Sequence, residues 1–186
     1  TLFRSYLSTF AIARPILEEL DLVGTIFVAP GLLSDYGKKT NSRMMSCLQV
    51  KELSMSDVFE IGGHTYNHIN LGAISTEQAE LEISSGREAL EELTGKQILT
   101  FAYPFGKKTL NYNDSTISLV EKSGFIGAVS TNRGKNRNIV SQKYELNRIG
   151  IDKKDTFESF VLKVHGLYPY RLVEKGIRLR SLVRGV

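Results

Sequence analysis

Hydrophobic positions along the 186-residue chain follow two alternating patterns. Short runs of β-branched, aromatic and small residues are typical of buried strands, and they occur at Gly24–Pro30, Phe59–Thr65, Ile98–Pro104, Phe125–Thr131 and Tyr144–Ile151. Stretches with helical spacing lie between or beside them, at Ser8–Leu20, Cys47–Ser56, Ser75–Leu93, Ser115–Ser123 and Thr156–His165. Strands that alternate with helices predict parallel pairing, with the crossover helices covering an open sheet or a barrel.

The stretch at Ser75–Leu93 has the clearest boundary signals. Ser75 stands three residues before Gln78, which is a capping-box arrangement, and Gly95 follows the last apolar position. We therefore expect one long helix that begins after Ser75 and ends at Gly95.

In parallel α/β folds, functional residues gather at the carboxyl ends of the strands. Four segments rich in Gly, Pro and polar residues each follow a predicted strand, namely Pro30–Gly31, Gly63–His68, Pro104–Gly106 and Thr131–Gly134. We expect these four segments to share one rim of the sheet or barrel.

The composition is that of one ordinary globular domain, with 41 % hydrophobic and 24 % charged residues. Residues 1–170 are neutral, which excludes a basic face for nucleic acid, and the net charge of +4 lies between Arg171 and Val186. We expect a main domain at 1–168 and a basic helical tail at 169–186, either solvated or in contact with an anionic membrane through 171–186. No transmembrane segment or intact signal peptide is visible, and the single cysteine, Cys47, excludes an internal disulfide.

The pair His64 and His68 is the main candidate for chemistry. Their spacing of four residues puts both imidazoles on one side of a helical turn, which suits two nitrogens that converge on one divalent metal. Thr65 and Asn67 would then hold the ring orientations. In the alternative interpretation, His64 ends a strand and His68 lies in a surface loop, both hydrogen-bonded without a metal. His165 fits a structural or exposed position near a helix end.

Two motifs resemble those of a known family. The segment EIGGHTYNHINL resembles the H-[ST]-x-x-H motif of the polysaccharide deacetylases, carbohydrate esterase family four, and FAYPFG resembles their R-x-P-[YF]-G motif. Other segments match the family in order and spacing, namely ARPILEEL, GTIFVAPG, SGREALEELTG and EKSGFIGAVSTNRG. The similarity runs from about Tyr6 to about Phe160.

The resemblance implies an α/β fold, an incomplete (β/α)7-type barrel of parallel strands whose first strand is missing or truncated. It implies a hydrolase that removes N-acetyl groups from amino-sugar polysaccharides or oligosaccharides with Zn²⁺ or another divalent metal. His64 and His68 correspond to metal ligands, and the backbone N–H of Phe105 corresponds to the donor that holds the oxyanion. The candidates for substrate binding are the rim residues Tyr66, Tyr103, Pro104 and Phe105.

The first family motif is different in this chain. Family members carry TFDDGY, in which the first Asp is the general base and the second is a metal ligand. The corresponding residues here are TLFRSY, so Phe3 and Arg4 replace both carboxylates and the general base is unassigned. Ala102 also stands where many members have an Arg that orients the base.

Two accounts fit this difference. In one, the protein is a catalytically inactive relative that binds glycan or a protein partner. In the other, the amino terminus comes from a truncated or shifted reading frame, and the body is inherited from an active enzyme. A protein–protein module that uses the basic tail is a further class. The compartment is left open between the bacterial cytoplasm and the cell envelope.

Overall fold

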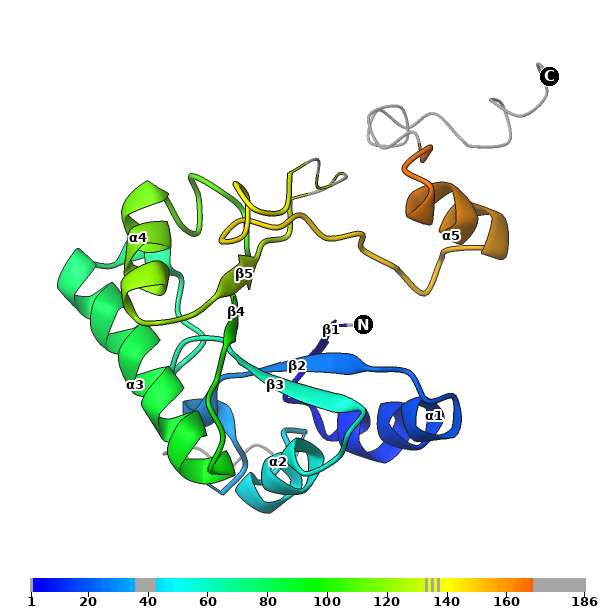
Figure 1. Ribbon diagram of the computed structural model, residues 1–186, viewed down its shortest axis with the longest axis horizontal. Coiled ribbons are helices and arrows are strands. Elements are labelled where there is room, and N and C mark those ends of the chain that lie inside the picture. Colours follow the sequence, from blue (N-terminus) through cyan, green and yellow to red (C-terminus); the bar gives the residue numbers. More distant parts are fainter. Residues whose placement is uncertain (1, 36–42, 133, 135, 137, 169–186) are drawn as a thin grey trace.

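Five parallel strands form the centre of the molecule, with the order β1-β2-β3-β4-β5 (Figure 1). The computed structural model describes residues 2–35, 43–132, 134, 136 and 138–168. The strands are β1 (Leu2–Arg4), β2 (Gly24–Val28), β3 (Phe59–Gly63), β4 (Thr100–Ala102) and β5 (Gly127–Val129). β1 and β2 pair along all three residues of β1, so the first strand is present but short. Sequential strands that lie side by side are the arrangement expected of a β/α barrel.

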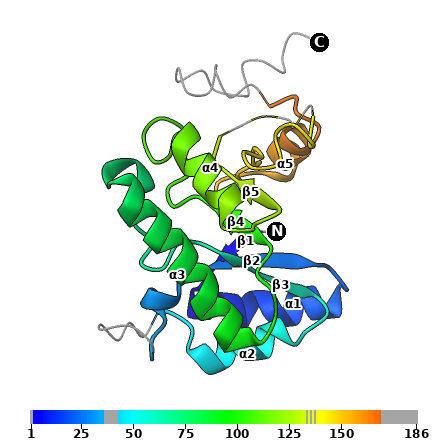
Figure 2. The same ribbon diagram turned by 60° about the vertical axis from the view of Figure 1, so that its left-hand side comes forward.

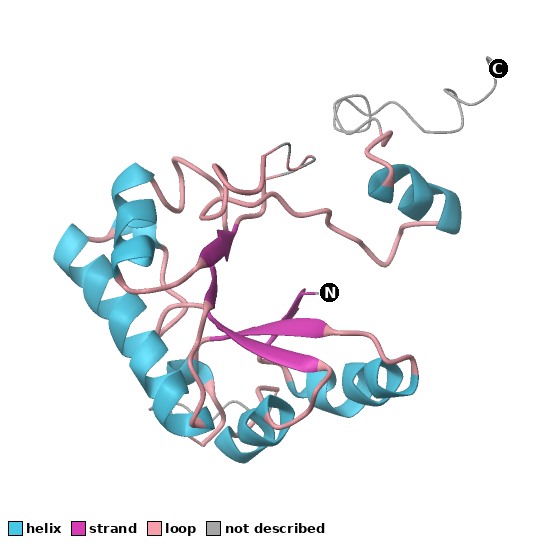
Figure 3. Ribbon diagram, viewed as in Figure 1, coloured by secondary structure: helices cyan, strands magenta, loops and turns pink. Residues whose placement is uncertain are grey.

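The helices connect the strands and lie on the outer side of the curved sheet (Figures 1 and 3). They are the π-helix η1 (Thr9–Ala13), which runs into α1 (Arg14–Glu19), followed by α2 (Cys47–Ser54), α3 (Thr76–Thr94), α4 (Asp114–Lys122) and α5 (Phe157–Val164). Two short 3-10 helices, η2 (Pro30–Leu32) and η3 (Leu71–Ala73), follow β2 and β3. Figure 2 shows α3 and α4 side by side, whereas α5 lies apart from the sheet, at the end of a long connection (Figure 1).

Helix α3 begins and ends where its sequence predicts. The Ser75 hydroxyl accepts a hydrogen bond from the Gln78 N–H, and the Gln78 side chain accepts one from the Ser75 N–H. At the other end, Gly95 has a φ of 68°, a left-handed conformation that glycine adopts without a steric penalty. The predicted capping box and stop are therefore both confirmed.

The hydrophobic core lies between the sheet and helices α2, α3 and α4. Its fully buried side chains come from every layer, and they include Ile26, Val28, Val50, Leu53, Ile83, Leu90, Phe101 and Val120. Helices cover one face only, and the sheet is an arc rather than a closed ring (Figure 3). The expected fold, an α/β partial barrel of parallel strands, is confirmed, and its first strand has three residues.

The strand predicted at Tyr144–Ile151 is wrong. Only Leu146 forms a parallel bridge, to Val129 of β5, and the backbone then leaves the sheet. The Asn147 N–H donates to the Asn136 side chain, and the Arg148 N–H donates to the Asn132 carbonyl. The next residues thus bind the loop after β5 instead of extending the strand.

Residues 169–186 lie outside the part of the chain that the structure describes, so the basic tail and the division at residue 168 stay predictions. Among the described residues, no helix has the length and apolar character that crossing a bilayer requires.

Candidate active site

The loops after the strands meet at one rim, as predicted. The Gly31 N–H donates to the Tyr66 carbonyl at 2.9 Å, which joins the loops after β2 and β3. The Thr131 N–H donates to the Gly106 carbonyl at 2.8 Å, which joins the loops after β4 and β5. Arg133, at the far end of the last segment, lies outside the described residues.

His64 follows β3 directly and is buried, with 6 % of its surface exposed. Its Nδ1 lies 2.6 Å from the carbonyl oxygen of Ala102, at the end of the neighbouring strand β4. A carbonyl can only accept, so Nδ1 carries a proton, and in the neutral form of the ring the lone pair lies on Nε2. This is how a carbonyl partner orients a metal-binding histidine.

The ring of His68 lies against that of His64, with centroids 4.7 Å apart and planes at 75°. The predicted proximity is confirmed, but the predicted helical turn is not. Residues 65–70 form no helix, and Thr65 and His68 have φ values of 60° and 58°, in the left-handed region. The turn between the two histidines therefore depends on two unfavourable backbone conformations, which the surrounding contacts must hold.

Both histidines line a cavity of about 160 Å³ at this rim. The other lining residues come from the segment after β1, the loop after β2 and the segment before α2, and they are Ser5, Tyr6, Ala29, Leu32 and Met44. Ser5 is buried, and Tyr6 is exposed at the cavity's edge. Two imidazoles thus face apolar and hydroxyl-bearing residues, and none of the described lining residues carries a carboxylate.

Two imidazoles are suitable ligands for a divalent metal, and the proton on His64 Nδ1 makes Nε2 the nitrogen that carries the lone pair. Within the described ranges, no three His, Cys, Asp or Glu side chains gather closely enough to hold a metal ion. The imidazole side of the cavity therefore fits a metal, and the described residues add no acidic ligand.

Phe105 lies beside His68. Its ring centroid is 5.0 Å from that of His68, and half of the residue is exposed. Its φ of 61° turns the backbone at the end of β4, and its carbonyl accepts a hydrogen bond from the Thr131 hydroxyl at 2.8 Å. Among the described residues, none accepts a hydrogen bond from the Phe105 N–H.

The other predicted sugar-binding residues lie elsewhere. Tyr103 is fully buried and stacks on Tyr112 with centroids 4.0 Å apart, so its ring belongs to the core and cannot stack on a sugar. Pro104 is buried as well. Tyr66 is half-buried and lines a second hollow, beside Leu81 of α3, rather than the histidine cavity.

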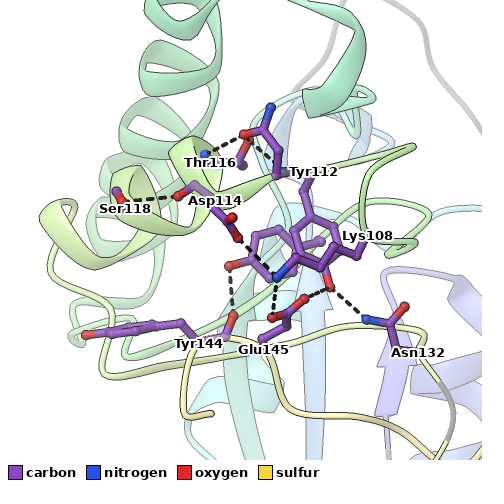
Figure 4. Close-up of polar contacts among 10 residues, drawn as sticks. Lys108, Tyr112, Asp114, Thr116, Ser118, Asn132, Tyr144 and Glu145 are labelled. Atoms are coloured by element: carbon purple, nitrogen blue, oxygen red, sulfur yellow. Dashed lines mark hydrogen bonds and ion pairs between the residues drawn. The ribbon is translucent and has the colours of Figure 1, made fainter. Parts of the chain in front are cut away.

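A polar network beneath the Phe105 loop ties the β4–α4 connection to the segment after β5 (Figure 4). Glu145 accepts hydrogen bonds from the Tyr112 hydroxyl at 2.9 Å and from Lys108 Nζ at 2.8 Å. The Asn132 amide donates to the same Tyr112 hydroxyl at 3.0 Å. Burial, helped by the bond to Glu145, raises the pKa of Tyr112 to about 12, so the phenol is neutral at physiological pH.

Sequence reasoning assigned Asn67 to orient the histidine rings, whereas the structure turns its side chain away from them. The Asn67 amide donates to Glu82 of α3 at 2.7 Å. Nothing in the sequence marks Glu82 as the partner of Asn67. The one indication that another segment packs closely on this part of α3 is Gly86, because a glycine in the middle of a long helix often marks a close neighbour.

The sequence matches the family model described as polysaccharide deacetylase over residues 8–127, which is more than half of the chain. No sequence among curated proteins matches it.

Solved structures of deacetylases share the fold. The deacetylase PplD of Streptococcus pyogenes, solved in complex with acetate, is 26 % identical with a TM-score of 0.75, and the match covers 87 % of this chain and 68 % of that one. A polysaccharide deacetylase from Bacillus cereus is 22 % identical with a TM-score of 0.74, and the match covers 88 % of this chain and 50 % of that one.

A third similar structure is a mutant of a Bacillus anthracis protein, described as a family-four carbohydrate esterase pseudoenzyme with restored enzymatic activity. It is 15 % identical with a TM-score of 0.58, and the match covers 72 % of this chain and 44 % of that one. The two Bacillus structures show the shared fold alone, and this chain spans half of their length or less.

Proposed function

This chain belongs to the polysaccharide deacetylase family, and we propose that its cavity binds N-acetylated amino-sugar polymers, with His64 and His68 as ligands of a divalent metal. The observation that carries the proposal is the close approach of the two imidazoles, 4.7 Å apart at the carboxyl ends of the strands. The bond from His64 Nδ1 to the Ala102 carbonyl supports it, because a proton on Nδ1 makes Nε2 the nitrogen whose lone pair would bind the metal. When bound there, Zn²⁺ or a similar ion supplies Lewis-acid polarisation of the acetyl carbonyl.

Phe105 has two roles in the proposed site. Its backbone N–H, which binds no acceptor among the described residues, donates to the oxygen on which charge develops when water attacks the acetyl group. Its half-exposed ring offers an apolar surface for a sugar beside His68. Thr131 holds this backbone through its hydroxyl.

The amino-terminal side of the cavity lacks the group that would take a proton from the attacking water. Phe3 and Arg4 stand where the family motif has two aspartates, and Ser5 and Tyr6 bring only hydroxyl groups. The first candidate is therefore an N-deacetylase site that lacks its base, with hydrolysis greatly slowed in this chain. The second candidate, favoured by the same two residues, is a relative that binds glycan or a protein partner without turnover. The pseudoenzyme with restored activity is a structural precedent for this state.

The proposal is tested by introducing the two carboxylates of the family motif at positions 3 and 4. In the variant Phe3→Asp/Arg4→Asp, we expect acetate release from an N-acetylglucosamine pentamer, with Zn²⁺ or Co²⁺ present, to rise by about 100-fold or more, the typical contribution of a general base. The matched control is Leu48→Asp/Lys51→Asp, which makes the same kinds of change on the exposed surface of α2 and should leave the rate unchanged.

The two candidates give different results. An N-deacetylase site lacking its base gains hydrolysis in the aspartate variant. A binding-only relative binds the pentamer in a calorimetric titration and still releases no acetate after the substitutions. A chain that binds neither Zn²⁺ nor the pentamer contradicts both.

A further inference from the structure

The turn that carries the two histidines is attached to α3 through one residue, Glu82. The Glu82 backbone carbonyl accepts a hydrogen bond from the Tyr66 N–H at 2.9 Å. Its carboxylate accepts two more, both from Asn67, namely from the backbone N–H at 2.8 Å and from the side-chain amide at 2.7 Å. Three hydrogen bonds from two successive residues of the turn thus end on a single helical residue.

Gly86, one helical turn further along α3, lets the two backbones approach. A Cβ at this position would lie 2.7 Å from the Thr65 carbonyl carbon and 2.8 Å from the Tyr66 nitrogen, closer than real Cβ atoms come. The histidine turn therefore rests directly on the backbone of α3 at Gly86, and the Glu82 carboxylate holds it there.

The turn is also held from the opposite side. The Gly31 N–H, in the loop after β2, donates to the carbonyl of Tyr66, the same residue whose N–H binds Glu82. Tyr66 and Asn67 are therefore clamped between the loop after β2 and α3. The flanking residues Thr65 and His68 are the ones that have positive φ angles. Clamping the middle of the turn is what keeps those two unfavourable conformations populated.

We propose that Glu82 is a positioning residue of the site, which fixes the His64–His68 turn by binding Asn67 and so keeps both imidazoles directed into one cavity. Both carboxylate oxygens of Glu82 are used by Asn67, and Glu82 does not line the histidine cavity, so it is neither a metal ligand nor a base. The inference rests on the proposed function in one respect, which is that its effect is measured as metal affinity. The geometry of the turn is a second, metal-independent readout.

The experiment first disrupts the contact between Asn67 and Glu82 with single substitutions and then rebuilds it with a double substitution. Glu82→Ala removes the clamp, and Asn67→Asp sets a carboxylate against the Glu82 carboxylate, so each variant should weaken Zn²⁺ binding by about 10- to 100-fold, as expected when the group that orients a ligand is lost. The double variant Asn67→Asp/Glu82→Gln restores both contacts: the side-chain contact has its donor and acceptor reversed, and the new amide oxygen at position 82 accepts from the residue-67 backbone N–H as the carboxylate did. We expect its Zn²⁺ affinity to return to within about threefold of the original.

Two measurements are made on the full-length chain. Calorimetry gives the Zn²⁺ affinity, and the nuclear Overhauser effect between the His64 and His68 ring protons reports their separation without any metal. Glu88→Ala is the matched control, because Glu88 is an exposed glutamate of the same helix, and it should change neither readout. Thermal unfolding confirms that each variant is folded.

Weakened binding and a lost ring-to-ring signal in the single variants, with recovery in the double variant, support the proposal. Unchanged readouts in folded Glu82→Ala, or no recovery in the folded double variant, overturn it. If Glu82→Ala does not fold, the comparison of Asn67→Asp with the double variant decides. If the unsubstituted chain binds no Zn²⁺, the metal part of the proposed function fails, and the ring-to-ring signal alone decides the role of Glu82.

Discussion

The two sides of the histidine cavity are built in different ways. On the imidazole side, His64 is buried and hydrogen-bonded to the Ala102 carbonyl, and the turn to His68 is clamped on α3. On the amino-terminal side, Ser5 and Tyr6 follow the three-residue strand β1, and the sequence from Thr1 to Tyr6 contains no acid. One side thus has the two proposed metal ligands, and the described residues of the other side bring no carboxylate.

The difference separates binding from proton transfer. A bound metal and a sugar need donors held in position, and the imidazole side together with Phe105 supplies them. Taking a proton from water needs a base, which the amino-terminal side does not supply. We therefore expect substitutions on the first side to change metal affinity and stability, and carboxylates added on the second side to change both the rate and the metal affinity.

The largest effect is expected from the amino-terminal side. Arg4→Asp removes a guanidinium and places a carboxylate directly before Ser5, which lines the cavity. The added negative charge attracts a divalent cation, so we expect Zn²⁺ affinity, measured by calorimetry, to increase on the order of 10- to 100-fold. Lys51→Asp makes the same change of charge on exposed α2. Equal affinities of the two variants would contradict the expectation that a carboxylate introduced at position 4 strengthens metal binding in this cavity.

The second-largest expected effect is a loss of stability on the imidazole side, where the histidine turn packs on α3. Gly→Ala in a helix usually stabilises it by up to about 1 kcal/mol, but at Gly86 the added Cβ would collide with the backbone of Thr65. We expect Gly86→Ala to lower the free energy of unfolding by about 1–3 kcal/mol, measured by urea denaturation. The opposite sign, with a more stable protein, would show that the histidine turn does not rest on α3.

The smallest effect concerns the network under Phe105. The pKa of Tyr112 is about 12, above its ordinary value near 10, so the stability that the neutral phenol contributes is fully present below pH 10 and is lost as the pH rises through 12. At pH 8, Tyr112→Phe should cost about 1 kcal/mol, the typical net contribution of its hydrogen bond to Glu145.

Urea denaturation at pH 8, 10 and 11.5 checks this expectation. The stability difference between the original chain and Tyr112→Phe should shrink as the pH approaches 12, because ionised Tyr112 can no longer donate to Glu145. A stability difference that stays constant over this pH range would contradict the expected link between ionisation of Tyr112 and the stability of the folded protein.

Structural features that depend only on residues close in the sequence could be predicted from local sequence patterns. Ser75, Gln78 and Gly95 set the ends of α3, because caps are made within one helical turn. The contact between His64 and His68 was also predicted, but through a helical turn. Their real conformation depends on α3, which lies beside the turn only in the folded protein.

Other features could not be read from the sequence because they depend on tertiary contacts. Tyr103 and Phe105 are aromatic neighbours in one motif, and only the strand's orientation determines that one enters the core and the other reaches the rim. The extended segment after Tyr144 leaves the sheet because Asn136 and Asn132 bind its backbone.

The central claim is that His64 and His68 together form the metal-binding half of a deacetylase site. A calorimetric titration of the full chain with Zn²⁺ at neutral pH tests this most directly, beside the double variant His64→Ala/His68→Ala. The account predicts one Zn²⁺ per chain and loss of this binding in the variant. No binding by the original chain, or equal binding by the folded variant, would contradict it.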